Sequence, residues 1–308
     1  MTVLQQMTRK PLLSISLVVI KMIRLSMNVL ASSLALLNRI ETYSFSSLSE
    51  LAYSKIVSIS AEDIFSFSTS CGWVSENENA LILTKHGTGL LRLQAQGLLI
   101  NLKRQMLADY VLKTAPIWSN RIPYGRREAT IFMSKDEKAC FADAGLLSDH
   151  LDTGIITWWD TIATKIRTQD QQAKNETGRL GERNTIKYER NRTNSEPIWM
   201  SIDSNLAGYD IKSRVSEDSS DILLIEVKAS TYALGQAVFH VTSHEWNVAL
   251  TSRAYVFHLW CLSDSKKMLA VISPDELLPY IPTNNLEGQW ESAQIPFSCF
   301  EGQFVEIA

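Results

Sequence analysis

The pattern of hydrophobic and polar positions is most regular in the last third of the chain. Two apolar-flanked runs, Tyr209–Val215 and Ile222–Ala229, are separated by the polar, turn-prone segment Ser216–Asp221. Short runs on either side of such a segment predict an antiparallel β-hairpin.

The alternation along this hairpin gathers charge on one face. Side chains of a strand point alternately to its two faces, so Glu226, Lys228 and Ser230 share a face. If the turn is centred in the polar segment, Asp210 lies opposite Glu226 on that face. Two carboxylates and a lysine on an apolar scaffold are costly to hold together without a positive ion among the carboxylates. The pattern therefore predicts a divalent metal site.

A helical pattern precedes the hairpin. Six residues share one helical face by their i, i+3/i+4 and i+7 spacing: Gly178, Gly181, Glu182, Thr185, Ile186 and Glu189. Glycine weakens a helix, so two glycines on one face indicate close approach to a sheet or a ligand. This face brings Glu182 toward the predicted sheet.

Further strands and one more helix complete the second half of the chain. Three segments have the apolar and β-branched composition of strands: Pro197–Asp203, Val238–Val241 and Ala254–Leu262. Thr242 and Glu245 have capping-box spacing, which predicts that a helix begins there. The order helix, three strands, helix, strand predicts an α/β domain with a mixed sheet over residues 165–308.

The pattern of residues 41–100 resembles a winged-helix module. It predicts a helix whose start carries the capping-box pair Ser47 and Glu50, a second helix over Ala61–Ser70, a strand pair and a closing helix from Lys85. The second helix has no basic residue, which favours protein contacts or packing over DNA readout. We expect a mostly helical domain here.

Residues 101–164 form a connecting region. Pro123–Glu128 predicts an irregular basic loop, in which Arg126 and Arg127 either contact nucleic-acid phosphates or stay solvated at a domain junction. Trp158 and Trp159 are expected in a core or an interface.

Residues 1–40 are strongly apolar. Lys21, Arg24 and Arg39 interrupt the run, so no stretch of 18 uncharged apolar residues exists. This predicts a buried or partner-packing helix and no membrane-spanning segment, with a membrane-surface role as the alternative. A partner protein or a second copy of the chain would bind through this region.

Composition limits the partners. The chain has 308 residues, 45% of them hydrophobic, and a formal net charge of −3, so any nucleic-acid surface must be local. Residues 165–192 hold eight Lys or Arg against four Asp or Glu. The candidate nucleic-acid-binding residues are Arg179, Arg183, Lys187, Arg190 and Ser230, besides Arg126 and Arg127. Four widely separated cysteines argue against zinc or a disulfide framework and suggest a reducing, cytoplasmic compartment.

The charged cluster suits phosphodiester hydrolysis. Hard oxygens bind Mg²⁺, for which Mn²⁺ would substitute, and the ion polarises a phosphoryl oxygen and lowers the pKa of water. Asp210 and Glu226, with the carbonyl of Val227, would be the ligands, and Glu182 would bind a second metal ion or hold a water. Lys228 would offset charge that builds up at the scissile phosphate. We find no Walker A loop and no G-x-S-x-G or G-x-G-x-x-G motif.

Five segments together carry a family resemblance. They are Gly178–Glu182, Tyr188-Glu189, Gly208–Ser213, Ile225–Ser230, and Phe239–Thr242 with Glu245. Over residues ~175–262 they resemble the PD-(D/E)XK nuclease superfamily, in the branch of bacterial and plant domains related to the C-terminal region of the plant NO VEIN protein. The resemblance implies a restriction-endonuclease-like core, DNA cleavage, and a role in anti-phage or mobile-element defence.

The sequence thus predicts a cytoplasmic, Mg²⁺-dependent nuclease with a winged-helix-like N-terminal part. The alternative is a catalytically inactive nucleic-acid-binding, regulatory or assembly protein that uses the same fold.

Overall fold

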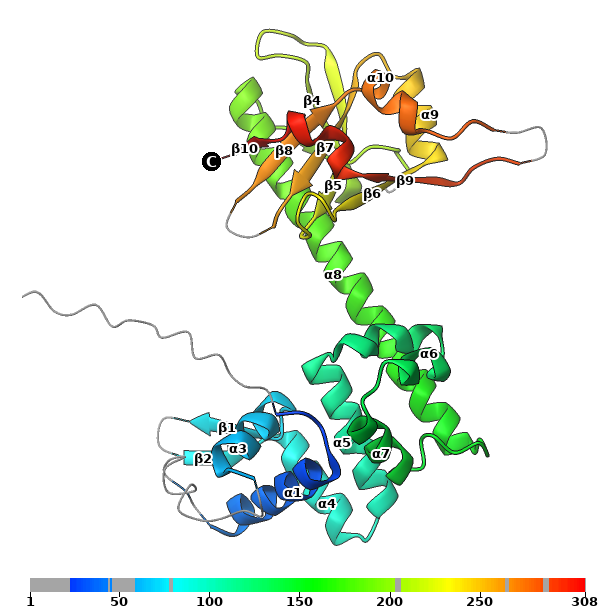
Figure 1. Ribbon diagram of the computed structural model, residues 1–308. Coiled ribbons are helices and arrows are strands. Elements are labelled where there is room, and N and C mark those ends of the chain that lie inside the picture. The colour runs from blue at the N-terminus through cyan, green and yellow to red at the C-terminus, as the bar shows by residue number, and fades with distance from the viewer. Residues whose placement is uncertain are drawn as a thin grey trace, which may run out of the picture. The chain divides into compact units, whose positions relative to one another are not determined.

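The structure is a computed structural model that describes residues 23–43, 45, 59–77, 80–202, 206–263, 266–284 and 288–307. The chain divides into two compact units, residues 1–167 and 168–308 (Figure 1). The predicted capping box of Ser47 and Glu50 lies outside the described residues, as does the apolar run before residue 23.

The first unit is mostly helical. Its elements are α1 (Met27–Thr42), α3 (Ala61–Ser70), β1 (Val74–Asn77), β2 (Ala80–Leu83), α4 (Lys85–Ala95), α5 (Leu99–Thr114), the 3-10 helix η1 (Ile117–Tyr124), α6 (Arg126–Ile131), α7 (Lys135–Asp143) and the first part of α8 (Thr153–Thr193). Ser60 and Thr84 cap α3 and α4 through their side chains, which explains where these helices begin. Within the described residues, no helix is long and apolar enough to cross a membrane.

Several local predictions for this unit are confirmed. The described part of the apolar N-terminal segment forms α1, whose Leu36 and Leu37 are fully buried in the core. The strand pair is the antiparallel hairpin β1–β2, and α4 follows it directly. Trp159 is buried and Trp158 packs against the same core, so both tryptophans belong to the interior.

The prediction of an irregular loop near residue 123 is wrong. This stretch forms η1 and α6 because Trp118 and Ile122 are buried and hold it against the core. The Arg126 guanidinium donates to the carbonyl oxygens of Leu146 and Ser148 at 3.3 and 2.9 Å, so it braces the neighbouring turn.

The second unit is an α/β structure around a six-stranded mixed sheet (Figure 1). After α8 come β3 (Ile198–Trp199), the 3-10 helix η2 (Met200–Ile202), β4 (Ile211–Arg214), β5 (Ile222–Ser230), β6 (Val238–Thr242), α9 (Ser243–Thr251), β7 (Tyr255–Cys261), β8 (Met268–Ile272), α10 (Pro274–Leu277), the 3-10 helix η3 (Leu278–Tyr280), β9 (Ser292–Pro296), the 3-10 helix η4 (Phe297–Gln303) and β10 (Val305–Glu306). The strand order is β10-β8-β7-β5-β4-β3, with β5 and β7 parallel and every other neighbouring pair antiparallel. Strand β6 is not part of this sheet and forms a separate two-stranded sheet with β9.

Helix α8 packs closely on one face of the sheet through Gly181. A Cβ atom at Gly181 would lie 2.7 Å from the Cβ of Ala229 and 3.2 Å from Cγ1 of Val227. One turn further on, Thr185 accepts a hydrogen bond from the buried indole of Trp260 at 2.7 Å. The predicted close approach is therefore correct for Gly181, whereas the space around Gly178 is open.

Candidate active site

The hairpin of β4 and β5 brings two carboxylates together. Ile211 pairs with Ile225, and the backbone N–H of Asp210 donates to the carbonyl oxygen of Ile225 at 2.9 Å. Asp210 therefore lies beside Glu226, as the alternation of the hairpin predicts. Glu226 points to the face opposite α8, because Ile225 and Val227 pack toward that helix.

Asp210 is held at the point where β4 and β5 separate. Its Oδ2 accepts a hydrogen bond from the backbone N–H of Val227 at 2.8 Å. The N–H and C=O of one strand residue point to the same side, so the Val227 carbonyl also faces this side of β5. Burial raises the pKa of Asp210 to about 6, although the Val227 N–H opposes the shift and the charge of Glu182 adds to it.

Lys228 lies between two carboxylates. Its Nζ is 2.7 Å from Oε1 of Glu226 and 3.0 Å from Oε1 of Glu245, and only 15% of its side chain is exposed. Burial alone lowers the pKa of Lys228, but the two carboxylates outweigh it and raise the pKa. Burial raises the pKa of Glu226 well above its usual range, with Lys228 opposing and Asp210 adding to the effect. The cluster is short of positive charge when Lys228 is its only cation.

Helix α9 supplies the third carboxylate of the cluster. Thr242 is the N-cap of α9, and Glu245 closes a full capping box with it, as the sequence predicts. Burial favours the neutral form of Glu245, but Lys228 and the Thr242 backbone N–H outweigh it and lower the pKa. The capping spacing could locate Glu245 on the first turn, but no local signal showed that this turn lies over Lys228.

Glu182 approaches from α8, on the other face of the sheet. Its carboxylate accepts hydrogen bonds from Arg179, from the indole of Trp199 and from the hydroxyl of Ser201, the first at 2.8 Å. It does not contact the other carboxylates, but its charge contributes to the raised pKa of Asp210. The sequence pattern gave no indication that Trp199 and Ser201 would bind Glu182.

The predicted nucleic-acid-binding residues fall into two groups. Arg179 pairs with Glu182, Arg190 pairs with Glu196 at 2.6 Å, and Ser230 is buried. Their polar groups are used within the fold, as are those of Arg126.

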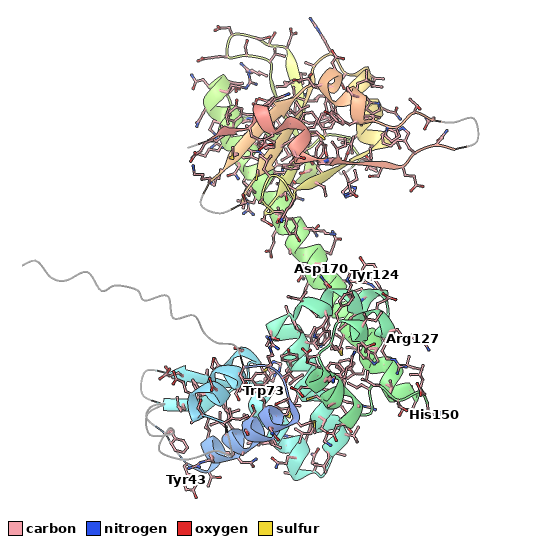
Figure 2. All side chains as sticks on the ribbon, in the orientation of Figure 1. Tyr43, Trp73, Tyr124, Arg127, His150 and Asp170 are labelled. Atoms are coloured by element: carbon pink, nitrogen blue, oxygen red, sulfur yellow. The ribbon has the colours of Figure 1, made fainter. Side chains whose placement is uncertain are left out.

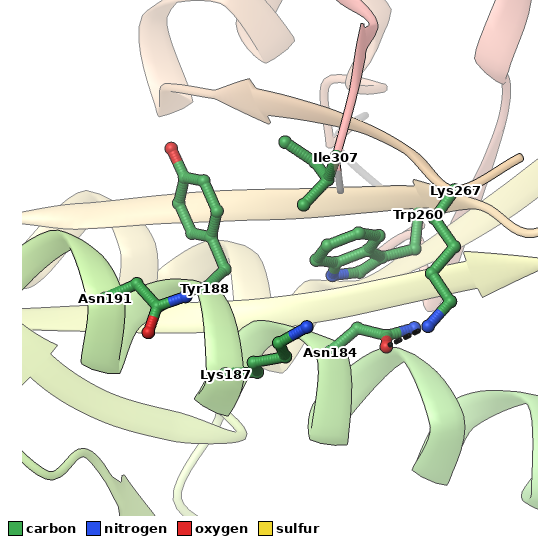
Figure 3. Close-up of a pocket in the computed structure, with 7 residues that line it drawn as sticks. All are labelled: Asn184, Lys187, Tyr188, Asn191, Trp260, Lys267 and Ile307. Carbon is green, nitrogen blue, oxygen red and sulfur yellow. Dashed lines mark hydrogen bonds between the residues drawn. The ribbon is translucent and has the colours of Figure 1, made fainter.

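The second group is exposed. Arg183 and Lys187 are exposed on α8. Arg127 is exposed on α6 (Figure 2). Among the described residues no carboxylate lies within ion-pairing distance of these three side chains. Lys187 lines a shallow pocket on the α8 face of the sheet (Figure 3), together with Asn184, Tyr188, Asn191, Trp260, Lys267 and Ile307.

The donor atoms at Asp210 and Glu226 fit a hard cation. The part of the chain that the structure describes has no cluster of three or more His, Cys, Asp or Glu side chains arranged to hold a metal ion. The buried Glu226 and half-buried Asp210 carboxylates, both with raised pKa values, and one backbone carbonyl are nevertheless oxygen donors of the kind Mg²⁺ prefers, and Mg²⁺ keeps several waters in such sites. A cation here would also supply the missing positive charge.

Comparison with known protein families shows a similarity that covers the residues of this site. The family model described as protein NO VEIN, C-terminal, matches residues 181–271, which include Glu182, Asp210, Glu226, Lys228 and Glu245. Neither the curated proteins nor the solved structures gave a significant match to the chain.

Proposed function

We propose that this protein is a metal-dependent nuclease that hydrolyses phosphodiester bonds of DNA. The observation that carries the proposal is the contact of Lys228 with Glu226, beside an Asp210 carboxylate fixed on the Val227 N–H. Two carboxylates and a lysine on adjacent strands are the groups that metal-assisted phosphodiester hydrolysis uses.

The order of elements supports a PD-(D/E)XK core of the restriction-endonuclease type. Helix α8 is followed by the sheet strands β3, β4 and β5, then by β6, which is outside the main sheet, then by α9 and by β7, which runs parallel to β5. The similarity to the NO VEIN C-terminal domain covers the same stretch. In the first unit, α3, the β1–β2 hairpin and α4 form the order that supports a winged-helix-like part.

Asp210, Glu226 and the Val227 carbonyl would hold Mg²⁺ or Mn²⁺. Once bound, the ion supplies a Lewis acid for the phosphoryl oxygen and lowers the pKa of water. Lys228 keeps its proton between two carboxylates and carries a positive charge to where negative charge builds up on the phosphate. Glu182 holds Arg179 and Ser201 at the border of the site and adds negative charge near Asp210.

The exposed cations Arg183, Lys187 and Arg127 would contact the DNA backbone, where Lys and Arg contribute affinity without sequence preference. The family resemblance supports a defence role against phage or mobile elements in the cytoplasm. Partner proteins or a second copy would bind through the N-terminal region.

The test is cleavage of plasmid and single-stranded DNA with Mg²⁺ or Mn²⁺. Wild type is compared with Asp210→Ala and Lys228→Ala, and with Asp218→Ala in the exposed turn of the hairpin as a matched control. Metal-dependent cutting that both site variants lose and the control keeps supports the proposal, while cutting that survives both site substitutions contradicts the site. DNA binding without cutting in wild type favours a catalytically inactive, nucleic-acid-binding protein.

A further inference from the structure

The two carboxylate oxygens of Glu245 have separate partners. Oε2 accepts a hydrogen bond from the backbone N–H of Thr242 at 2.8 Å, which closes the N-terminus of α9. Oε1 lies 3.0 Å from Nζ of Lys228 on strand β5. The capping box therefore fixes one end of an ion pair that crosses from helix to strand.

This arrangement restricts where Lys228 can go. A four-carbon side chain has much rotamer freedom, which a single exposed ion pair would not remove. Here the side chains of Lys228 and Glu245 are only 15% and 17% exposed, and the Thr242 N–H holds the Glu245 carboxylate in one orientation.

The two carboxylates beside Lys228 differ in the other groups that they contact. Glu226 is a proposed cation ligand, so its oxygens are shared with whatever binds between it and Asp210. Glu245 has its second oxygen committed to the backbone of its own helix. The contact of Glu245 with Lys228 therefore does not compete with a cation bound between Glu226 and Asp210.

We propose that Glu245 is a positioning residue that holds the ammonium group of Lys228 over the carboxylate cluster through a helix-capping carboxylate. The holding contact stands on its own geometry, and its consequence for catalysis rests on the proposed nuclease function.

Three variants distinguish the contact of Glu245 with Lys228 from its role in capping α9. Glu245→Gln removes the charge, and glutamine at this position still supports a capping box. Thr242→Val removes the hydroxyl that caps α9 but keeps the backbone N–H and the ion pair. Glu276→Gln changes the equivalent capping glutamate of α10, which has no lysine partner among the described residues.

The first readout does not depend on activity. The folded full-length protein is labelled with an amine-reactive reagent at a single pH, and the modification rate of Lys228 is followed by mass spectrometry, with the exposed Lys266 as internal reference. We expect Glu245→Gln to raise the Lys228 rate severalfold, and Thr242→Val and Glu276→Gln to leave it unchanged. An unchanged rate in Glu245→Gln, or an equal rise in Thr242→Val, overturns the positioning role even if the protein is a nuclease.

The second readout measures DNA cleavage. Glu245→Gln is expected to lower kcat with little change in KM, whereas Thr242→Val and Glu276→Gln should leave kcat unchanged. An unchanged kcat in Glu245→Gln, or an equal loss in Thr242→Val, overturns the proposal. If wild type cuts no DNA, the nuclease proposal fails while the labelling result still decides the contact between Glu245 and Lys228.

Discussion

The carboxylate of Asp210 accepts a hydrogen bond from the backbone N–H of Val227, 2.8 Å away, at the point where their two strands separate. The side chain takes the place of the backbone acceptor that a continuing β4 would offer. A half-buried carboxylate is thereby fixed in position even though its partial burial disfavours the charged form. The charge state of Asp210 therefore depends on folding, and the pH dependence of stability can measure it.

The raised pKa of Asp210 predicts a pH-dependent stability difference. Its pKa is about 6 in the folded chain against an ordinary value of 3.8, so between these values the folded state binds more protons than the unfolded state. The free energy of unfolding therefore falls as pH rises through 6. Asp210→Asn keeps an acceptor for the Val227 N–H but has no carboxyl group to titrate. Its free energy of unfolding should therefore rise relative to that of wild type by up to about 3 kcal/mol as the pH increases from 4 to 7.5.

Urea titrations of both proteins without divalent metal ions measure this difference. The effects of titrating groups that do not interact with Asp210 cancel in the comparison, whereas Glu182, Glu226 and Glu245 interact with it and contribute to the difference. A stability difference that stays constant over this pH range would show that Asp210 is not held in a raised state.

His258 predicts a pH dependence of the opposite sign. It is fully buried on the α8 face of the sheet, with Nε2 3.9 Å from Oε1 of Glu189. Burial lowers the pKa of His258 to about 4, helped by Arg192 and opposed by Glu189. Below pH 6.5 His258 becomes protonated in the unfolded chain but stays neutral in the folded chain. The free energy of unfolding therefore decreases as pH falls, by up to about 3 kcal/mol at pH 4.

His258→Phe keeps a ring against Tyr188 and has no proton to bind. The variant should lose less stability than wild type between pH 6.5 and pH 4.5 in the same titrations. Parallel curves for the two proteins would contradict the neutral buried state.

Local patterns were sufficient for much of the second unit. The polar turn and the period-two alternation specify the β4–β5 pairing, because a register shift by one residue would turn Glu226 and Lys228 into the apolar face under α8. Likewise, the spacing of Thr242 and Glu245 locates the start of α9, since a capping box depends only on neighbouring residues.

Contacts between distant segments were beyond such patterns. The residues near β6 do not indicate that it pairs with β9, more than fifty residues later in the chain, instead of joining the main sheet. Likewise, the residues near Glu245 do not indicate that Lys228 is its partner. Spacing alone also gave Gly178 and Gly181 the same role, whereas only Gly181 touches the sheet. The close contact that distinguishes Gly181 from Gly178 arises from the packing of α8 on the sheet, which is tertiary structure.

These glycines predict opposite effects of the same substitution. At Gly181 a new methyl group would lie 2.7 Å from the Cβ of Ala229, so α8 must shift away from the sheet. We expect Gly181→Ala to lower the free energy of unfolding by about 1–3 kcal/mol. At Gly178 no atom lies within 4 Å of the new Cβ, and alanine favours the helix, so Gly178→Ala should gain up to about 1 kcal/mol. Denaturant unfolding of the pair checks both signs, and destabilisation of equal size at both positions would contradict the close packing of Gly181.

The charge balance of the cluster predicts that divalent metal ions stabilise the folded chain. Burial raises the pKa values of both Asp210 and Glu226, and neighbouring carboxylates add to the effect, so a cation between them offsets that cost. At a Mg²⁺ concentration ten times its Kd, binding to the folded state alone adds about 1.4 kcal/mol to the free energy of unfolding. Thermal melts at pH 7.5 should therefore show Tm rising with Mg²⁺ and returning to its starting value with a chelator. Asp210→Asn should abolish the rise, while Asp218→Asn in the exposed turn should keep it, and an equal rise in both variants would place the bound ion elsewhere.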